Sequence, residues 1–124
     1  MSSTAYKPEL FLEFADKLIS DTKYDEKSRS RVVVGRAYYT AFLKAQKKLG
    51  ELGYPLNDPS RIHKQAIDAL RSLKPDLGDK FSGLFDKRVD ADYHMSVDIR
   101  KEIGKWSIKT AQIVVSEISA LKKK

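Results

Sequence analysis

Apolar residues recur every three or four positions along most of the chain, which is the spacing of one face of an α-helix. The first such segment covers residues 8–20 and opens with Pro8, a residue that suits the first turn of a helix. The apolar side of this segment consists of Leu10, Phe11, Phe14, Leu18 and Ile19. We therefore predict a first helix over residues 8–20, with one face turned towards a core.

Residues 26–52 carry the longest helical pattern of the chain. Their apolar stripe consists of Val34, Tyr38, Ala41, Phe42, Ala45, Leu49 and Leu52. The charged residues lie mostly off that stripe, as they do on a helix that covers a core. The three valines at 32–34 would suit a strand, but the run is too short to predict one. Gly53 is predicted to end the helix in a left-handed conformation.

Three further patterns follow in the second half of the chain. Asn57-Asp58-Pro59 is typical of a helix start, because Asp is a good N-cap and Pro suits the first turn. The core face of this helix consists of Ile62, Ala66, Ala69, Leu70 and Leu73. A shorter helix is predicted after Asp76 from Leu77, Phe81, Leu84 and Phe85. A long last helix, capped by Ser96 or Asp98, is predicted from Ile99, Ile103, Trp106, Ile113, Val114, Ile118 and Leu121.

These elements together predict an all-α fold. No segment shows the sustained alternation of apolar and polar residues that a half-buried strand requires. The connections between the predicted helices are short, which favours antiparallel neighbours. We therefore expect one domain over residues 1–124, built as an up-and-down bundle of four main helices with a short extra helix before residue 88.

Composition narrows the classes of function. The 124 residues include no cysteine, which excludes disulfides, a thiol nucleophile and a cysteine-based zinc site. No apolar run approaches the roughly 18 to 20 residues of a membrane span, and the N-terminus lacks the pattern of a signal peptide. We therefore expect a soluble cytoplasmic protein without a membrane partner. The 24 Lys and Arg against 17 Asp and Glu give a net charge of +7, which favours polyanionic partners such as RNA.

The stretch Arg88-Val-Asp-Ala-Asp-Tyr-His94 contains the residues best suited to chemistry. A guanidinium can hold the negative charge that develops on a phosphodiester, and an imidazole can move a proton at neutral pH. Another interpretation is structural, with Arg88 paired to Asp90 or Asp92. On one straight helix, two side chains six residues apart point about 120° away from each other. Arg88 and His94 can therefore share one phosphate only if the segment bends or a second copy of the chain completes the site.

The other candidate residues carry weaker signals. Asp90, Asp92 and His94 alternate, so an extended loop would turn all three the same way and could hold magnesium through a substrate phosphate. The two histidines show no His-Glu-x-x-His spacing, and we expect neither a metal site nor another cofactor.

Three residues earlier in the chain carry further weak signals. His63 is predicted to be a half-buried or surface residue of its helix. Arg36 and Tyr39 flank the apolar stripe of the long helix, where they could face a partner.

Two strings in this order resemble the HEPN (higher eukaryotes and prokaryotes nucleotide-binding) family, in its small stand-alone prokaryotic branch. They are Arg36-Ala-Tyr-Tyr-Thr-Ala-Phe42 and Arg88-Val-Asp-Ala-Asp-Tyr93, and the resemblance covers most of the chain. It implies a helical bundle that forms a homodimer. Many members resemble metal-independent endoribonucleases in which Arg is followed by His after four to six residues, and five residues separate Arg88 from His94.

The resemblance also implies roles and partners. His94 would act as acid or base and Arg88 would hold the phosphoryl oxygens, while a ribose 2′-OH attacks the adjacent phosphate and leaves a cyclic phosphate. Side chains expected to support this pair are Asp90, Asp92, Tyr93, Arg36 and Tyr39. The protein would then be the toxin of a toxin–antitoxin pair, with a minimal nucleotidyltransferase as its antitoxin.

Two positions depart from the active members of this family. Val89 stands where they usually have a polar residue, and Ser96 stands where toxins silenced by AMPylation have a tyrosine. The alternative is therefore a non-catalytic HEPN module that binds a nucleotidyltransferase or a nucleotide. A third interpretation is a helical bundle that binds nucleic acid without cutting it.

Overall fold

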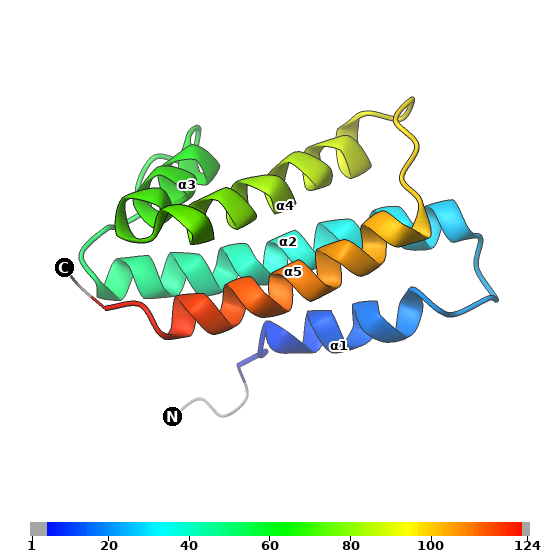
Figure 1. Ribbon diagram of the computed structural model, residues 1–124, viewed down its shortest axis with the longest axis horizontal. Helices are drawn as coiled ribbons and strands as arrows, with labels where there is room; N and C mark the ends of the chain where they lie inside the picture. The colour runs from blue at the N-terminus through cyan, green and yellow to red at the C-terminus, as the bar shows by residue number, and fades with distance from the viewer. Residues whose placement is uncertain (1–4, 123–124) are drawn as a thin grey trace.

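The computed structural model describes residues 5–122, which form five α-helices and no strand (Figure 1). The helices are α1 (Glu9–Leu18), α2 (Glu26–Glu51), α3 (Ile62–Leu73), α4 (Pro75–Tyr93) and α5 (Lys101–Ser119). The prediction of an all-α bundle is confirmed. Residues 1–4 and 123–124, which belong to the domain predicted over residues 1–124, lie outside the described range. Within that range, no helix combines the length and the hydropathy that crossing a bilayer requires.

The long helices α2 and α5 lie along each other at the centre of the bundle and run in the same direction (Figure 1). Helices α1 and α4 run the opposite way and cover different sides of this pair. Helix α3 packs against α4 and α2 at one end of the molecule. Helix α2 contacts each of the other four helices, so residues along its whole length position the rest of the fold.

The short extra helix predicted before residue 88 is wrong. Helix α4 has 19 residues and continues through Arg88 to Tyr93, whereas α1 and α3 are the short helices. The pattern was weak there because Ala91 is the only buried residue between 88 and 93, at 3% exposure. No proline or glycine interrupts the segment, so nothing in it ends the helix.

Helix α2 ends as its sequence predicts. Gly53 has a φ of 90°, in the left-handed region that favours glycine. The Tyr54 amide then donates to the Leu49 carbonyl at 2.7 Å, and the Gly53 amide donates to the Gly50 carbonyl at 3.2 Å. These two bonds satisfy carbonyls that have no partner inside the helix.

Two predicted helix starts are wrong. Helix α3 begins at Ile62, because the Asp58 carboxylate accepts from the Ser60 amide at 3.0 Å and forms a separate turn. Helix α5 begins at Lys101, and neither Ser96 nor Asp98 caps it. Asp98 instead accepts from Nε of Arg100 at 2.7 Å. Short polar side chains can hydrogen-bond locally in several ways, so their presence does not fix the first residue of a helix.

The main core lies between α2, α3, α4 and α5. Tyr38 and Phe42 belong to it, as the stripe of the long helix predicts. Helices α3 and α5 pass α4 at two of its glycines, closely at Gly78 and at an ordinary contact distance at Gly83. A Cβ at Gly78 would lie 2.6 Å from the backbone nitrogen of Arg71 in α3. A Cβ at Gly83 would lie 3.5 Å from Cη2 of Trp106 in α5.

Candidate functional site

The candidate residues lie at the carboxyl end of α4. Arg88, Asp90, Asp92 and Tyr93 belong to its last turns, and His94 is the residue that ends it, with φ −112° and ψ 85°. The extended loop that would have turned Asp90, Asp92 and His94 the same way is therefore wrong. Within residues 5–122, no group of three or more His, Asp or Glu side chains is arranged to hold a metal ion.

Arg88 is held by two side chains of its own helix. Its Nε donates to Oδ2 of Asp92 at 3.0 Å, one helical turn away. Its guanidinium carbon lies 5.2 Å from the centre of the Tyr93 ring, and Nη2 lies 3.5 Å from the Tyr93 hydroxyl. The side chain is 25% exposed. The sequence left open whether Arg88 pairs with Asp90 or Asp92, and the structure shows the pair with Asp92. These contacts also fix the direction of the guanidinium.

His94 is oriented by Asp90. Nδ1 of the imidazole lies 2.9 Å from Oδ1 of Asp90, and the side chain is 54% exposed. Because an ionised carboxylate only accepts hydrogen bonds, Nδ1 carries the proton in this pair. Nε2 is then the nitrogen with a free lone pair, and the structure gives it no protein partner within residues 5–122. His94 therefore presents a proton acceptor to solvent at the end of α4.

Arg88 and His94 do not contact each other. Each is paired with a different aspartate, Asp92 for the arginine and Asp90 for the histidine. The end of α4 also lies close to α2, because a Cβ at Gly35 would stand 3.4 Å from Oδ1 of Asp92. One chain thus holds both groups in fixed directions without joining them on one phosphate.

Arg36 and Tyr39 lie elsewhere. The guanidinium carbon of Arg36 is 5.0 Å from the ring centre of Phe11 in α1 and 4.9 Å from that of Tyr39. The Phe11 and Tyr39 rings pack edge to face at 5.9 Å. Arg36 and Tyr39 thus pack with α1, and among the described residues neither contacts the end of α4. Of the supporting residues, only Asp90, Asp92 and Tyr93 contact Arg88 or His94.

A second polar pair joins α2 and α3. The hydroxyl of Tyr38 and Nδ1 of His63 are hydrogen-bonded at 2.6 Å. The imidazole stacks on Phe85 at 5.0 Å and packs against Phe42 at 4.8 Å, so the expectation of a half-buried helix residue is confirmed. Burial lowers the pKa of His63, and the positive charge of Arg88 lowers it further. Burial also raises the pKa of Tyr38 far above its ordinary value.

Lowering the pH from about 7.5 to about 5.5 is expected to destabilise the wild-type protein more than a His63→Gln variant. Because the folded protein depresses the pKa of His63, the unfolded chain takes up a proton at higher pH than the folded one. The contribution of the neutral imidazole is complete above the unfolded value of about 6.5 and is lost as the pH falls below it. Urea unfolding at both pH values measures this difference. Equal losses in the two proteins would contradict it.

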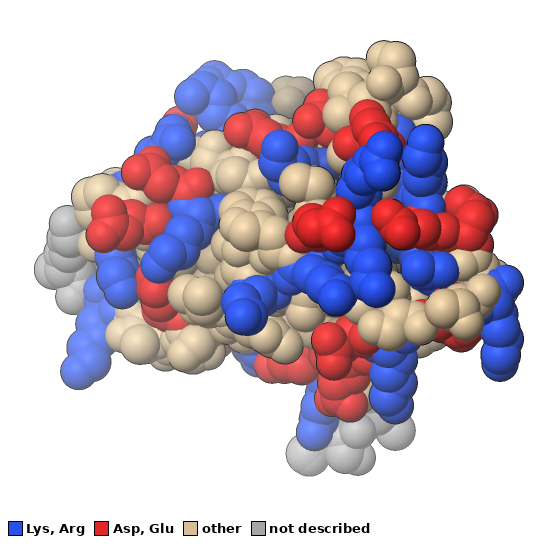
Figure 2. Space-filling view, turned by 45° about the vertical axis from the view of Figure 1, so that its right-hand side comes forward, with Lys and Arg blue, Asp and Glu red and all other residues tan. Residues whose placement is uncertain are grey.

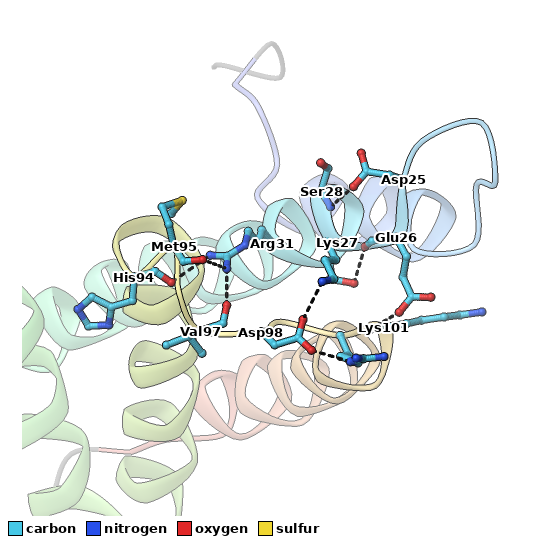
Figure 3. A network of polar contacts seen from close by, with 12 residues as sticks. Asp25, Glu26, Lys27, Ser28, Arg31, His94, Met95, Val97, Asp98 and Lys101 are labelled. Atoms are coloured by element: carbon cyan, nitrogen blue, oxygen red, sulfur yellow. Dashed lines mark hydrogen bonds and ion pairs between the residues drawn. The ribbon is translucent and has the colours of Figure 1, made fainter.

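The most extensive contact near His94 comes from Arg31 of α2, a residue that no sequence pattern indicated. The guanidinium donates from Nη1 to the carbonyls of Asp90 at 3.2 Å, Ala91 at 2.9 Å and His94 at 3.5 Å. From Nη2 it donates to Met95 at 3.3 Å and to Val97. Figure 3 shows Arg31 reaching the turn while the His94 ring points away from it. An arginine that binds backbone carbonyls leaves no periodic pattern in the sequence.

The excess of positive charge does not form one continuous patch on the face seen in Figure 2. Lysine and arginine side chains there are interspersed with acidic ones. Several bases of the described residues are paired, wherever they lie on the surface, among them Lys44 with Glu9 at 2.8 Å and Lys80 with Glu117 at 2.9 Å. A polyanion on this face would therefore meet basic side chains with acidic groups beside them.

No protein-family model matches the chain, and no curated protein is significantly similar to it in sequence.

Proposed function

We propose that the protein is a metal-independent endoribonuclease of the HEPN type, which acts as a homodimer. The observation that carries this proposal is the state of His94. Its imidazole is exposed, Asp90 holds Nδ1, and Nε2 is free for proton transfer at a position six residues after Arg88. The alternative in which His94 is buried in its own protomer receives no support from this geometry.

The arrangement suits transfer of a phosphoryl group within RNA. Nε2 of His94 takes the proton of a ribose 2′-OH, and the 2′-oxygen forms a bond to the adjacent phosphorus. The bond from phosphorus to the 5′-oxygen breaks, and that oxygen leaves with a proton from Nε2 of the second His94 of the dimer, which enters the step as imidazolium and ends it neutral. Arg88 holds the phosphoryl oxygens as negative charge develops on them. The products are a 2′,3′-cyclic phosphate and a free 5′-hydroxyl.

A second copy of the chain would complete a site in which Arg88 and His94 act on the same phosphate. Since Arg88 and His94 are held on separate aspartates, two protomers facing each other would place two of each residue along one cleft. The surface beside His94 supports this arrangement, because Tyr93 is 64%, Met95 66% and Val97 37% exposed. A cluster of exposed apolar side chains at a turn is typical of a surface that another molecule covers.

The proposed cellular role rests on the family resemblance. An endoribonuclease of this kind would act as the toxin of a toxin–antitoxin pair, and its minimal nucleotidyltransferase antitoxin would have to block the cleft between the two His94 side chains. The net charge of +7 supports attraction of RNA.

The purified protein is expected to be a dimer that cleaves RNA in EDTA. Light scattering at micromolar concentration measures the first property. Incubation with an RNA of mixed sequence, followed by analysis of the product ends, measures the second. Cyclic-phosphate ends and unchanged rates in EDTA are expected, because the mechanism uses only protein side chains. A strict monomer would remove the composite site, and cleavage only with magnesium would point to Asp90 and Asp92 as ligands.

The alternative function is a non-catalytic HEPN module that binds a nucleotidyltransferase or a nucleotide. One observation favours it: Arg88 is already paired with Asp92 and packed against Tyr93 within its own chain. In that case the dimer would form but no RNA would be cut above background. Val89, the apolar residue beside Arg88, would then mark the inactive branch.

A further inference from the structure

The carboxyl end of α4 depends on a charge from another helix. The last carbonyls of a helix have no partner within it, and the helix dipole places partial negative charge there. Helix α4 has no basic residue in its last turn. Arg31 supplies the missing cation from α2, with donors to the carbonyls of Asp90 and Ala91 inside the helix and to three carbonyls of the turn after it.

The start of α5 depends on the same helix. Arg100, the residue that precedes α5, makes no capping bond with its side chain. The carboxylate of Glu26 in α2 accepts from the Lys101 amide instead, at 3.3 Å. Lys27 also lies 3.7 Å from Asp98 in the turn. Both ends of the turn between α4 and α5 are therefore attached to the first part of α2 (Figure 3).

We propose that Arg31 is a positioning residue for His94. The guanidinium binds the backbone carbonyl of His94 and the backbone carbonyl of Asp90, whose carboxylate holds the imidazole. It therefore fixes the residue that carries the ring and the residue that orients it. Arg31 acts through the backbone and does not touch RNA. The inference rests on the proposed ribonuclease function, but the contacts that carry it are independent of that function.

The chemistry of the contact requires arginine. Five carbonyl oxygens, spread from Asp90 to Val97, accept from the two terminal nitrogens of one planar group. A lysine at this position would keep the charge, but its three donors come from a single atom and could not reach both the helix end and the far side of the turn. Arg31→Lys therefore keeps the positive charge but loses the hydrogen bonds that reach both the helix end and the far side of the turn.

The test compares Arg31→Lys with wild type, and uses Arg100→Gln as a matched control. Arg100 lies at the same turn but binds the Asp98 side chain and no carbonyl of the α4 end. In Arg31→Lys we expect kcat for RNA cleavage to fall about 10- to 100-fold, with KM and the dimer unchanged. Exchange of the His94 and Val97 amides with solvent, followed by NMR, should become faster. Arg100→Gln should leave kcat and both exchange rates as in wild type.

A merely structural role would show as a lower melting temperature with the kcat of the folded enzyme intact, and that result would overturn the proposal. Wild-type kcat together with unchanged amide exchange in Arg31→Lys would also overturn it. If the wild-type protein cleaves no RNA, the ribonuclease function fails, and the exchange measurement still decides the inference about Arg31. Faster exchange at both amides would then support the positioning of His94, and unchanged exchange would refute it.

Discussion

Replacing His94 with alanine is expected to abolish RNA cleavage and to leave the fold and the dimer intact. The imidazole is 54% exposed, and Asp90 is its only partner among the residues that the structure describes, so its removal costs little packing. Histidine is the side chain that ordinarily exchanges a proton near neutral pH, and His94 is the histidine that lies nearer to Arg88 in the sequence. Loss of a general acid–base group typically lowers the rate about 10²- to 10⁴-fold. Initial rates on RNA in EDTA, with circular dichroism and light scattering on the same samples, measure the effect.

His63→Ala is the control for this experiment, because it removes the other histidine of the chain. It breaks the bond to Tyr38 and lowers stability, but it should cost far less in the cleavage rate of the folded protein. If His94→Ala cuts RNA as fast as wild type, Arg88 is a structural residue and the resemblance is one of fold only. If His63→Ala is the inactive variant, the proton transfer belongs to the Tyr38–His63 pair instead.

Replacing Gly78 with alanine is expected to lower the free energy of unfolding by about 3 kcal/mol. Alanine ordinarily stabilises a helix interior relative to glycine. Here its Cβ would stand 2.6 Å from the nitrogen and 2.7 Å from the Cα of Arg71, both backbone atoms of α3. Backbone atoms cannot swing aside as a flexible side chain does, so α3 and α4 must separate. Denaturant unfolding measures the loss.

Gly50→Ala provides the matched control in α2. A Cβ at Gly50 would meet nothing within 4 Å, so alanine should stabilise the protein by up to about 1 kcal/mol. Both substitutions replace glycine with alanine, but they should change the free energy of unfolding in opposite directions. If Gly78→Ala were as stable as wild type, the close passage of α3 over α4 would not constrain the sequence.

The sequence predicted much of the fold because its signals are periodic or local. The stripe through Tyr38 and Phe42 predicted a buried face of α2, and Gly53 predicted the end of that helix. The continuous α4 was not predicted, because Arg88–Tyr93 is almost entirely polar and shows no apolar period. The apolar period is absent because Ala91 is the only buried residue of this segment.

The candidate site was predictable only in part. The pairing of Arg88 with Asp92 follows from their spacing of one helical turn, and so does that of His94 with Asp90. The contacts of Arg31 could not be predicted, since they join residues about sixty positions apart through backbone carbonyls. Arg36 and Tyr39 pack with Phe11 of α1, a contact that no sequence pattern indicated, and Tyr39 stays 38% exposed, so its role as a partner-facing residue stays a prediction.

The contact between Gly83 and Trp106 gives the protein an intrinsic optical reporter. Trp106 is the only tryptophan of the chain and is 42% exposed, and its ring lies against α4 at Gly83. Its fluorescence therefore originates from one place, the surface where α4 meets α5. A movement that separates these helices would expose more of the indole and shift its emission to longer wavelength. Such a movement of the helix that carries Arg88 can thus be followed in the unlabelled native protein.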